Sequence, residues 1–224
     1  MAQNSQVSNH YNSIAREYDL HDNTNQLVAT DKFIYGFIQR HGCVPNIIDL
    51  GCGTGRSIDW LKLMPHEYYG IDISEGMLEQ FKINHPGYRC EKKDIYQPDI
   101  LSNRGEKTAI SLYGSPCYTT LDKFIELTKQ LWANFLHVYL LLYGVERNAE
   151  TFEAQSEMGI LKPLVCDSKT LYHLHKEIPT LKWKGIDRFK KKNLTLSVPR
   201  YYINIGIDSL TRQVERFAWV MLYK

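Results

Sequence analysis

The chain has 224 residues, of which 43% are hydrophobic and 23% charged, a composition typical of one soluble globular domain with a substantial core. The net charge of +2 does not indicate a large nucleic-acid-binding surface, and the most apolar segment, "LHVYLLLYGV", is about half as long as a membrane span. Five cysteines without C-x-x-C spacing, together with a polar N-terminus, argue against a disulfide framework, a zinc ribbon and a signal peptide, and predict a cytoplasmic protein.

Apolar periodicity predicts alternating helices and strands over the first two thirds of the chain. In chain order we expect a helix over 26–42, a strand over 46–50, a helix over 56–64, a strand over 67–73, a helix over 74–85 with Ser74 as its N-cap, strands over 87–94 and 107–114, a helix over 121–136 and a strand over 137–143. This alternation favours a parallel sheet covered by helices on both faces.

The pattern is less regular beyond Gly144. In chain order we expect a loop or lid over 145–163, a helix over 167–178 that begins at Asp167 or Ser168, and strands over 181–189 and 216–224. The apolar spacing in 199–213 fits a strand and a helix equally poorly, so both interpretations stay open there.

The stretch "IIDLGCGTGRS", residues 47–57, joins a buried strand to a helix through three glycines, Gly51, Gly53 and Gly55. Glycine lets a ligand approach the main chain closely, and ligands of open parallel sheets bind at the carboxyl ends of the strands. The alternative is a tight turn without a ligand. The spacing matches neither G-x-G-x-x-G nor a P-loop, whereas Asp72 ends the next strand, where a carboxylate would bind ribose hydroxyls. A ligand with a ribose but no pyrophosphate is therefore favoured.

Three motifs in this order, "IIDLGCGTGRS", "YYGIDISEGML" and "CEKKDIYQ", resemble the class I S-adenosylmethionine (SAM)-dependent methyltransferases. The similarity covers about residues 11 to 145 and includes "HYNSIAREYDL", which resembles a segment before the core of small-molecule members. The resemblance implies an α/β, Rossmann-like, seven-stranded and mostly parallel sheet with one antiparallel strand near its C-terminal edge. It implies a single domain over 1–224, with an N-terminal helical cover (1–42), a cofactor-binding core (43–144) and a substrate-side segment with C-terminal strands (145–224).

The same resemblance implies a role for each motif residue. Gly51, Gly53 and Gly55 would contact the methionyl and ribose parts of SAM; Asp49 would hold its amino group; Asp72 would accept from the ribose hydroxyls; Ile73, Asp94 and Ile95 would bind adenine; Leu112 and Tyr113 would lie near the methyl group; and Tyr11 and Tyr18 would close over the site. One departure is Thr108, which stands where members often begin the fourth strand with an aspartate.

Methyl transfer from a sulfonium is an in-line displacement, so the protein mainly aligns the reactants and excludes water. A general base helps for some acceptors, and the candidates are His137, His173, His175, Tyr113 and Tyr118. We retain Tyr113 and His173 as the catalytic candidates and expect no metal. A tyrosine cluster, formed by Tyr113, Tyr118, Tyr143, Tyr201 and Tyr202, could line an acceptor pocket.

The predicted function is SAM-dependent methylation of a small molecule at nitrogen or oxygen. Two alternatives remain: an RNA or DNA methyltransferase, and a catalytically silent cofactor-binding subunit. The nearly balanced charge argues against a nucleic-acid substrate. We also expect no membrane partner. We expect a monomer or a homodimer.

Overall fold

A computed structural model describes residues 2–21, 25–42, 45–97, 106–144, 163–191, 194–199 and 219–224. These residues form one eight-stranded sheet with the order β3-β2-β1-β4-β5-β8-β6-β7. The strands are β1 (Ile47–Leu50), β2 (Tyr68–Asp72), β3 (Arg89–Lys92), β4 (Thr108–Ser111), β5 (His137–Tyr143), β6 (Lys182–Lys191), β7 (Leu194–Pro199) and β8 (Trp219–Tyr223).

The five strands from β3 to β5 pair in parallel, and β8, β6 and β7 continue the sheet with antiparallel pairs. The predicted mostly parallel, Rossmann-like α/β fold is confirmed, with β8 as an antiparallel strand on the C-terminal side where one was expected and β7 as a second. The sheet has one strand more than the seven expected, because β7 pairs along β6 at the edge. The strands of the first two thirds of the chain (β1 to β5) and those near its C-terminal end (β6 to β8) therefore belong to one sheet.

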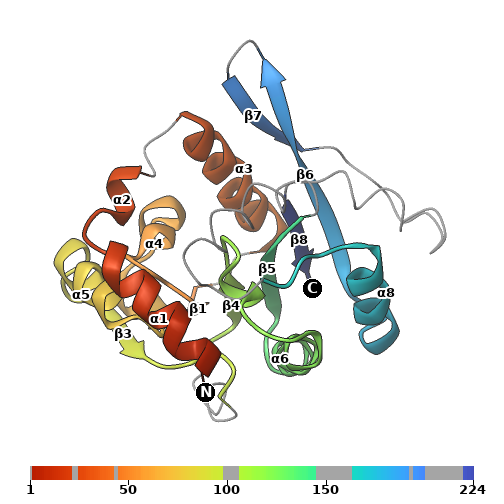
Figure 1. Ribbon diagram of the computed structural model, residues 1–224, viewed down its shortest axis with the longest axis horizontal. Coiled ribbons are helices and arrows are strands. Elements are labelled where there is room, and N and C mark those ends of the chain that lie inside the picture. The colour runs from red at the N-terminus through yellow and green to blue at the C-terminus, as the bar shows by residue number, and fades with distance from the viewer. Residues whose placement is uncertain are drawn as a thin grey trace.

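Helices cover both sides of this sheet (Figure 1). They are α1 (Ala2–Ile14), α2 (Tyr18–His21), α3 (Asn25–Gly42), α4 (Arg56–Leu61), α5 (Glu75–Asn84), α6 (Leu121–Asn134) and α8 (Ser168–Glu177), with short 3₁₀ turns η1 (Pro65–Glu67) and η2 (Ser115–Cys117). Figure 1 shows α3 on one side of the sheet and α6 with α8 on the other, while α1 lies across α5. None of the described helices is long and apolar enough to cross a membrane.

The core follows from continuous apolar runs in the central strands. Ile47, Ile48 and Leu50 of β1 are fully buried, as are residues 138–142 of β5. Strands with both faces buried read as unbroken apolar runs rather than as alternating patterns. The central position of β1 in turn places its carboxyl end, and the glycine loop that follows, in the middle of one sheet edge.

The predicted elements up to Tyr143 are present, with small differences at their ends. The helix expected over 56–64 ends at Leu61, because Lys62 adopts a left-handed conformation with φ 56° and Pro65 opens η1. Asp167, not Ser168, is the N-cap of α8 and accepts from the Thr170 N–H at 2.7 Å. The predicted loop or lid over 145–163 lies outside the described residues except for its last position, as does the ambiguous segment 199–213 apart from the end of β7.

Candidate cofactor site

The glycine loop turns sharply away from β1 and is held by the neighbouring strand. Gly51, Gly53 and Gly55 have positive φ values of 83°, 53° and 96°, which side chains other than glycine rarely adopt. The N–H groups of Gly51 and Cys52 both donate to the Ile71 carbonyl, at 2.7 and 2.9 Å. The loop is thus a fixed turn at the carboxyl ends of β1 and β2.

The three glycines differ in what a side chain would meet. A Cβ atom at Gly51 would lie 2.4 Å from the Ser115 Cβ, and one at Gly55 would lie 2.4 Å from the His85 ring. A Cβ atom at Gly53 would meet nothing within 4 Å. Gly51 and Gly55 are therefore required by packing inside the protein, whereas Gly53 faces open space that a ligand could fill.

Asp72 lies at the end of β2 and faces this open space. Its Oδ2 atom accepts from the Gly53 N–H at 2.9 Å, and its Oδ1 atom accepts from the Ser74 N–H at 2.8 Å. Burial raises the pKa of Asp72, and the N–H groups of Ser74 and Gly53 oppose that rise. Each oxygen keeps a second lone pair, so the carboxylate can still accept from the two hydroxyls of a ribose.

A cavity opens beside Gly53 and Asp72, with about 700 Å³ of empty space including its mouth. Its lining consists of Val7, Tyr11, Tyr18, Gly51, Gly53, Asp72, Ile73, Met77, Asp94, Ile95, Tyr96, Tyr113, Ser115 and Tyr118. The described lining therefore combines two carboxylates with several aromatic and aliphatic side chains, and it contains no basic side chain.

Most of the residues predicted from the motifs meet in this cavity. Tyr11, Tyr18, Gly51, Gly53, Asp72, Ile73, Asp94, Ile95 and Tyr113 all line it, while Asp49, Gly55, Leu112 and His173 do not. Sequence reasoning did not single out Val7, Met77, Tyr96 or Ser115. Two of these carried a usable signal, since Tyr96 follows Asp94 by two positions and Ser115 lies in the loop after the fourth strand, at the same edge of the sheet.

Asp49 points its carboxylate at protein groups. Its Oδ2 atom accepts from the hydroxyls of Ser57 and Tyr68, the latter at 2.8 Å, and the residue is 4% exposed. Burial raises the pKa of Asp49 to about 6, against the lowering effect of the Ser57 and Tyr68 hydrogen bonds. These contacts tie the end of β1 to α4 and β2, and they give Asp49 no direct place in the cavity lining.

Tyr113 is held by an ion pair between Asp31, which lies outside the predicted motifs, and Arg56 of the glycine-loop motif. Its hydroxyl donates to Asp31 Oδ1, while Arg56 binds Asp31 Oδ2 through Nε at 3.0 Å and through a second nitrogen at 2.5 Å. Asp31 is 1% exposed, and the Arg56 guanidinium lies 5.2 Å from the centre of the Tyr113 ring. Tyr113 also has φ 56°, a conformation that is uncommon for residues other than glycine.

Three tyrosine hydroxyls form a chain from the cavity into the core. The hydroxyls of Tyr11 and Tyr118 lie 3.0 Å apart, and those of Tyr118 and Tyr143 lie 3.4 Å apart. Of the predicted tyrosine cluster, Tyr113 and Tyr118 line the cavity and Tyr143 lies behind Tyr118, while positions 201 and 202 lie outside the described residues. That this cluster lines an acceptor pocket stays a prediction. Burial raises the pKa values of Tyr11, Tyr113 and Tyr118.

The remaining candidates lie elsewhere. His173 is on α8, where its ring meets that of Tyr172 edge-on at 5.8 Å, and it is not part of the cavity lining. Leu112 is buried. Thr108 is buried at the start of β4, opposite Ile47 and His137. The described residues contain no group of histidine, cysteine and carboxylate side chains that could hold a metal ion.

Comparisons with known proteins agree with this fold. Residues 47–128 match a methyltransferase domain family. A SAM-dependent methyltransferase of Thermotoga maritima, described as a possible histamine N-methyltransferase, superposes with a TM-score of 0.64 at 13% identity, over 96% of this chain and 97% of its own. A SAM-dependent methyltransferase of Anabaena variabilis gives 0.62 at 15% identity, over 98% and 92%. Magnesium protoporphyrin IX methyltransferase of Synechocystis, with bound S-adenosylhomocysteine (SAH), gives 0.60 at 12% identity, over 99% and 98%. No curated protein sequence matches the chain significantly.

The fold has the Rossmann-like architecture of class I methyltransferases, with a cavity at the carboxyl ends of its parallel strands. The matched methyltransferase domain spans the glycine loop, β2 and the following elements, and the fold is that of the SAM-dependent methyltransferases compared above. The residues present fit this cofactor: Gly53 leaves a cradle that a Cβ atom would occupy, and Asp72 offers acceptors beside it.

Proposed function

We propose that the protein transfers the methyl group of SAM to a small-molecule acceptor, with the cofactor bound between the glycine loop, Asp72 and Asp94. The observation that carries this proposal is the pairing of Gly53 with Asp72, because an open cradle lies directly beside a carboxylate with free lone pairs. In this arrangement Asp72 accepts from the ribose hydroxyls. Asp94 accepts from the adenine amino group, while Ile73 and Ile95 pack on the ring.

Charge in the cavity supports a cationic cofactor. The described lining contains Asp72 and Asp94 but no lysine, arginine or histidine, and its tyrosine rings can contact a sulfonium through their faces. When bound, SAM supplies an activated methyl group on a positively charged sulfur. The described side chains then have to orient it, cover it and exclude water.

The tyrosines act in this proposal as positioning groups. The Tyr113 hydroxyl is a donor to Asp31 and its pKa is raised by burial, so it stays protonated near neutral pH. Neither feature suits a proton acceptor. We therefore favour an acceptor that reaches the site as a free nucleophile, such as an amine in its neutral form. His173 receives no support from the cavity geometry.

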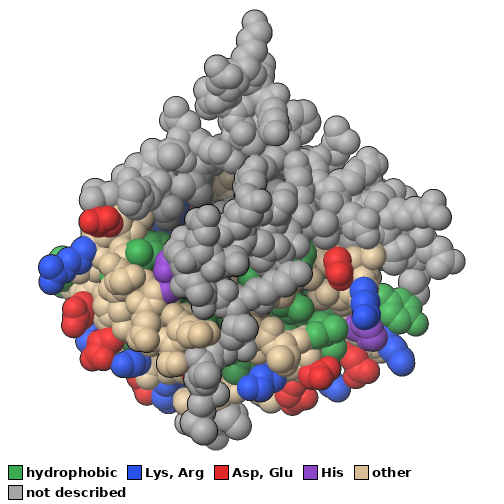
Figure 2. Space-filling view, in the orientation of Figure 1, with side chains coloured by type: hydrophobic (Ala, Val, Ile, Leu, Met, Phe, Trp, Pro, Cys, Tyr) green, Lys and Arg blue, Asp and Glu red, His purple; other side chains and the backbone are tan. Residues whose placement is uncertain are grey.

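Nucleic acid is the less supported acceptor. The described cavity lining offers no basic side chain to phosphates, and on the face in Figure 2 lysine and arginine side chains are interspersed with aspartate and glutamate. The tyrosine and aliphatic side chains of the described lining suit a small molecule better. Assembly as a monomer or homodimer and a cytoplasmic location stay predictions from the sequence.

The test uses purified protein with methyl-labelled SAM and a panel of small amines, alcohols and thiols. We expect SAH to form together with one labelled acceptor class, and Asp72→Asn to reduce turnover with SAM at subsaturating concentration. Turnover on RNA or DNA alone would replace the proposed acceptor. SAH binding without turnover on any compound of the panel would instead favour a silent cofactor-binding subunit.

A further inference from the structure

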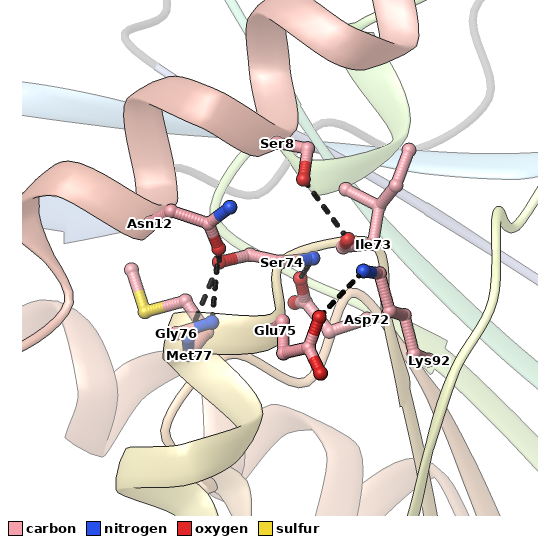
Figure 3. A network of polar contacts seen from close by, with 9 residues as sticks. All are labelled: Ser8, Asn12, Asp72, Ile73, Ser74, Glu75, Gly76, Met77 and Lys92. Atoms are coloured by element: carbon pink, nitrogen blue, oxygen red, sulfur yellow. Dashed lines mark hydrogen bonds and ion pairs between the residues drawn. The ribbon is translucent and has the colours of Figure 1, made fainter.

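The N-terminal helix α1 is fastened to the turn that follows Asp72 (Figure 3). The Asn12 side-chain oxygen accepts from the Ser74 hydroxyl at 2.7 Å and from the Gly76 N–H at 2.9 Å. The Ser8 hydroxyl donates to the Ile73 carbonyl at 3.2 Å. These bonds join residues more than 60 positions apart, from α1 to the first turn of α5.

This attachment is continuous with the carboxylate of the cofactor site. The Ser74 N–H donates to Asp72 Oδ1, while the Ser74 hydroxyl caps α5 by accepting from the Met77 N–H at 3.2 Å. Asn12 therefore binds a residue that itself orients Asp72. Its neighbour Tyr11 lines the cavity from α1.

Gly76 permits the close approach of the two helices. A Cβ atom there would lie 3.1 Å from the Asn12 Cα, 3.2 Å from the Asn12 carbonyl oxygen and 3.2 Å from the Ala15 Cβ. A larger side chain at this position would push α1 away from α5. The glycine is in a helix and at no positive φ, so its role here is the space it leaves.

A second attachment holds the segment after α1. Asp19 of α2 accepts from the Thr54 hydroxyl in the glycine loop at 2.8 Å and from the Asn84 amide at the end of α5 at 3.2 Å. Tyr11 and Tyr18, which both line the cavity, therefore lie on a cover that α5 holds at its first turn and at its last residue.

We propose that Asn12 is a positioning residue that holds α1 closed over the cofactor site, and that release of SAH requires its bonds to Ser74 and Gly76 to break. The inference rests on the proposed function, because it takes SAH as the occupant of the cavity. Asn12 is solvent-exposed, so water can replace its bonds when the cover opens. A few polar contacts at an exposed position suit a contact that breaks in every turnover.

The experiment measures the dissociation rate of SAH by stopped-flow displacement, together with kcat and the KM for SAM. We expect Asn12→Ala to raise the dissociation rate about tenfold, equivalent to about 1.4 kcal/mol for two lost hydrogen bonds, and to raise KM more than it lowers kcat. Asn12→Asp keeps an acceptor oxygen at the helix N-terminus and should restore a rate near that of the wild type.

Two further variants separate positioning from general stability. Gly76→Leu improves the helix propensity of α5 but displaces α1, so it should also accelerate SAH release about tenfold. Asn9→Ala, at an exposed position on α1, should leave the rate unchanged. In the ligand-free protein, hydrogen exchange over residues 2–14 should be faster in Asn12→Ala than in Asn9→Ala.

The outcomes distinguish this inference from the proposed function. If wild-type protein binds no SAH, the proposed function fails and the inference fails with it. If SAH binds but Asn12→Ala and Gly76→Leu release it at the wild-type rate, only the inference is overturned. The same holds if Asn12→Asp releases SAH as fast as Asn12→Ala does.

Discussion

Asp49 and Asp72 lie on adjacent parallel strands, and different kinds of hydrogen-bond donor hold the two carboxylates. Asp72 accepts from backbone N–H groups of the two turns around the cavity, whereas Asp49 accepts from the hydroxyls of Ser57 and Tyr68. Backbone donors fix Asp72 where a ligand can reach it. Side-chain donors enclose Asp49, so it would affect cofactor binding indirectly, by holding the glycine loop in place.

The raised pKa of Asp49 makes stability depend on pH. Between its ordinary value of 3.8 and about 6, the folded chain binds more protons at Asp49 than the unfolded chain does, so stability falls as pH rises through this window. Asp49→Asn removes the titration but keeps an acceptor oxygen. We expect the variant to gain up to roughly 3 kcal/mol relative to the wild type between pH 4 and pH 7.

Denaturant unfolding at a series of pH values measures this difference directly. A difference in unfolding free energy that stays constant from pH 4 to pH 7 would contradict the assignment of the titration to Asp49. Ser57→Ala is a useful companion, because it removes one donor to the same carboxylate and should raise the Asp49 pKa further.

Single residues were predictable where a short motif encodes them. The glycines, Asp72 and Asp94 follow strand ends at fixed spacing, so their meeting at one sheet edge could be inferred from the sequence. The ion pair of Asp31 with Arg56 could not, because 25 positions separate its members and only tertiary packing brings Tyr113 to them. His173 was predicted from its residue type alone, and residue type does not indicate where a side chain lies in the fold.

At the scale of elements, the glycines of the loop have different roles, some in internal packing and one beside the open cavity. Gly51 and Gly55 face Ser115 and His85 at distances no side chain tolerates, while Gly53 faces the cavity. The boundaries of the loop follow from the elements on either side, since β1 ends at Leu50 and α4 begins at Arg56 after Gly55 in a left-handed conformation.

Alanine at these positions should therefore act in two ways. Gly53→Ala costs about 1–2 kcal/mol of stability for its positive φ and fills part of the cradle, so SAH affinity should fall at least tenfold. Gly51→Ala adds an overpacking cost of about 1–3 kcal/mol. Thermal unfolding and SAH titration of both variants check this. A Gly53→Ala protein that binds SAH normally would contradict the cradle.

Elements themselves were predictable because apolar period and capping agree along most of the chain. The sequence predicts Ser74 as the N-cap of α5, which is confirmed, but not its second role as a donor to Asn12. That second role joins α1 to α5 across more than 60 positions, and no local pattern encodes such a contact. Strand β7 was not predicted, because it pairs with β6 and extends the sheet beyond the predicted edge.

At the scale of the molecule, the last strand, β8, occupies an interior position in the sheet. β8 lies between β5 and β6, its residues Val220, Met221 and Leu222 are buried, and the Lys224 ammonium donates to the carbonyls of Trp132 and Phe135 at 2.5 and 2.7 Å. The end of the described chain therefore contributes to the same core as β1 and β5.

Removal of residues 219–224 should abolish cooperative folding, because β5 and β6 would lose the strand between them. Lys224→Ala retains the strand and should remain folded. Circular dichroism and thermal unfolding compare the two proteins. A truncated chain that unfolds with the cooperativity and midpoint of the wild type would contradict the central position of β8.

The most direct test of the site is calorimetric titration of SAH into the wild-type protein and into Asp72→Asn. We expect measurable binding to the wild type and at least tenfold weaker binding to the variant, because a carboxylate accepts more strongly than an amide from the ribose hydroxyls. Absence of binding heat with both SAM and SAH, alongside binding of a nicotinamide dinucleotide or a nucleoside triphosphate, would contradict the account at its centre.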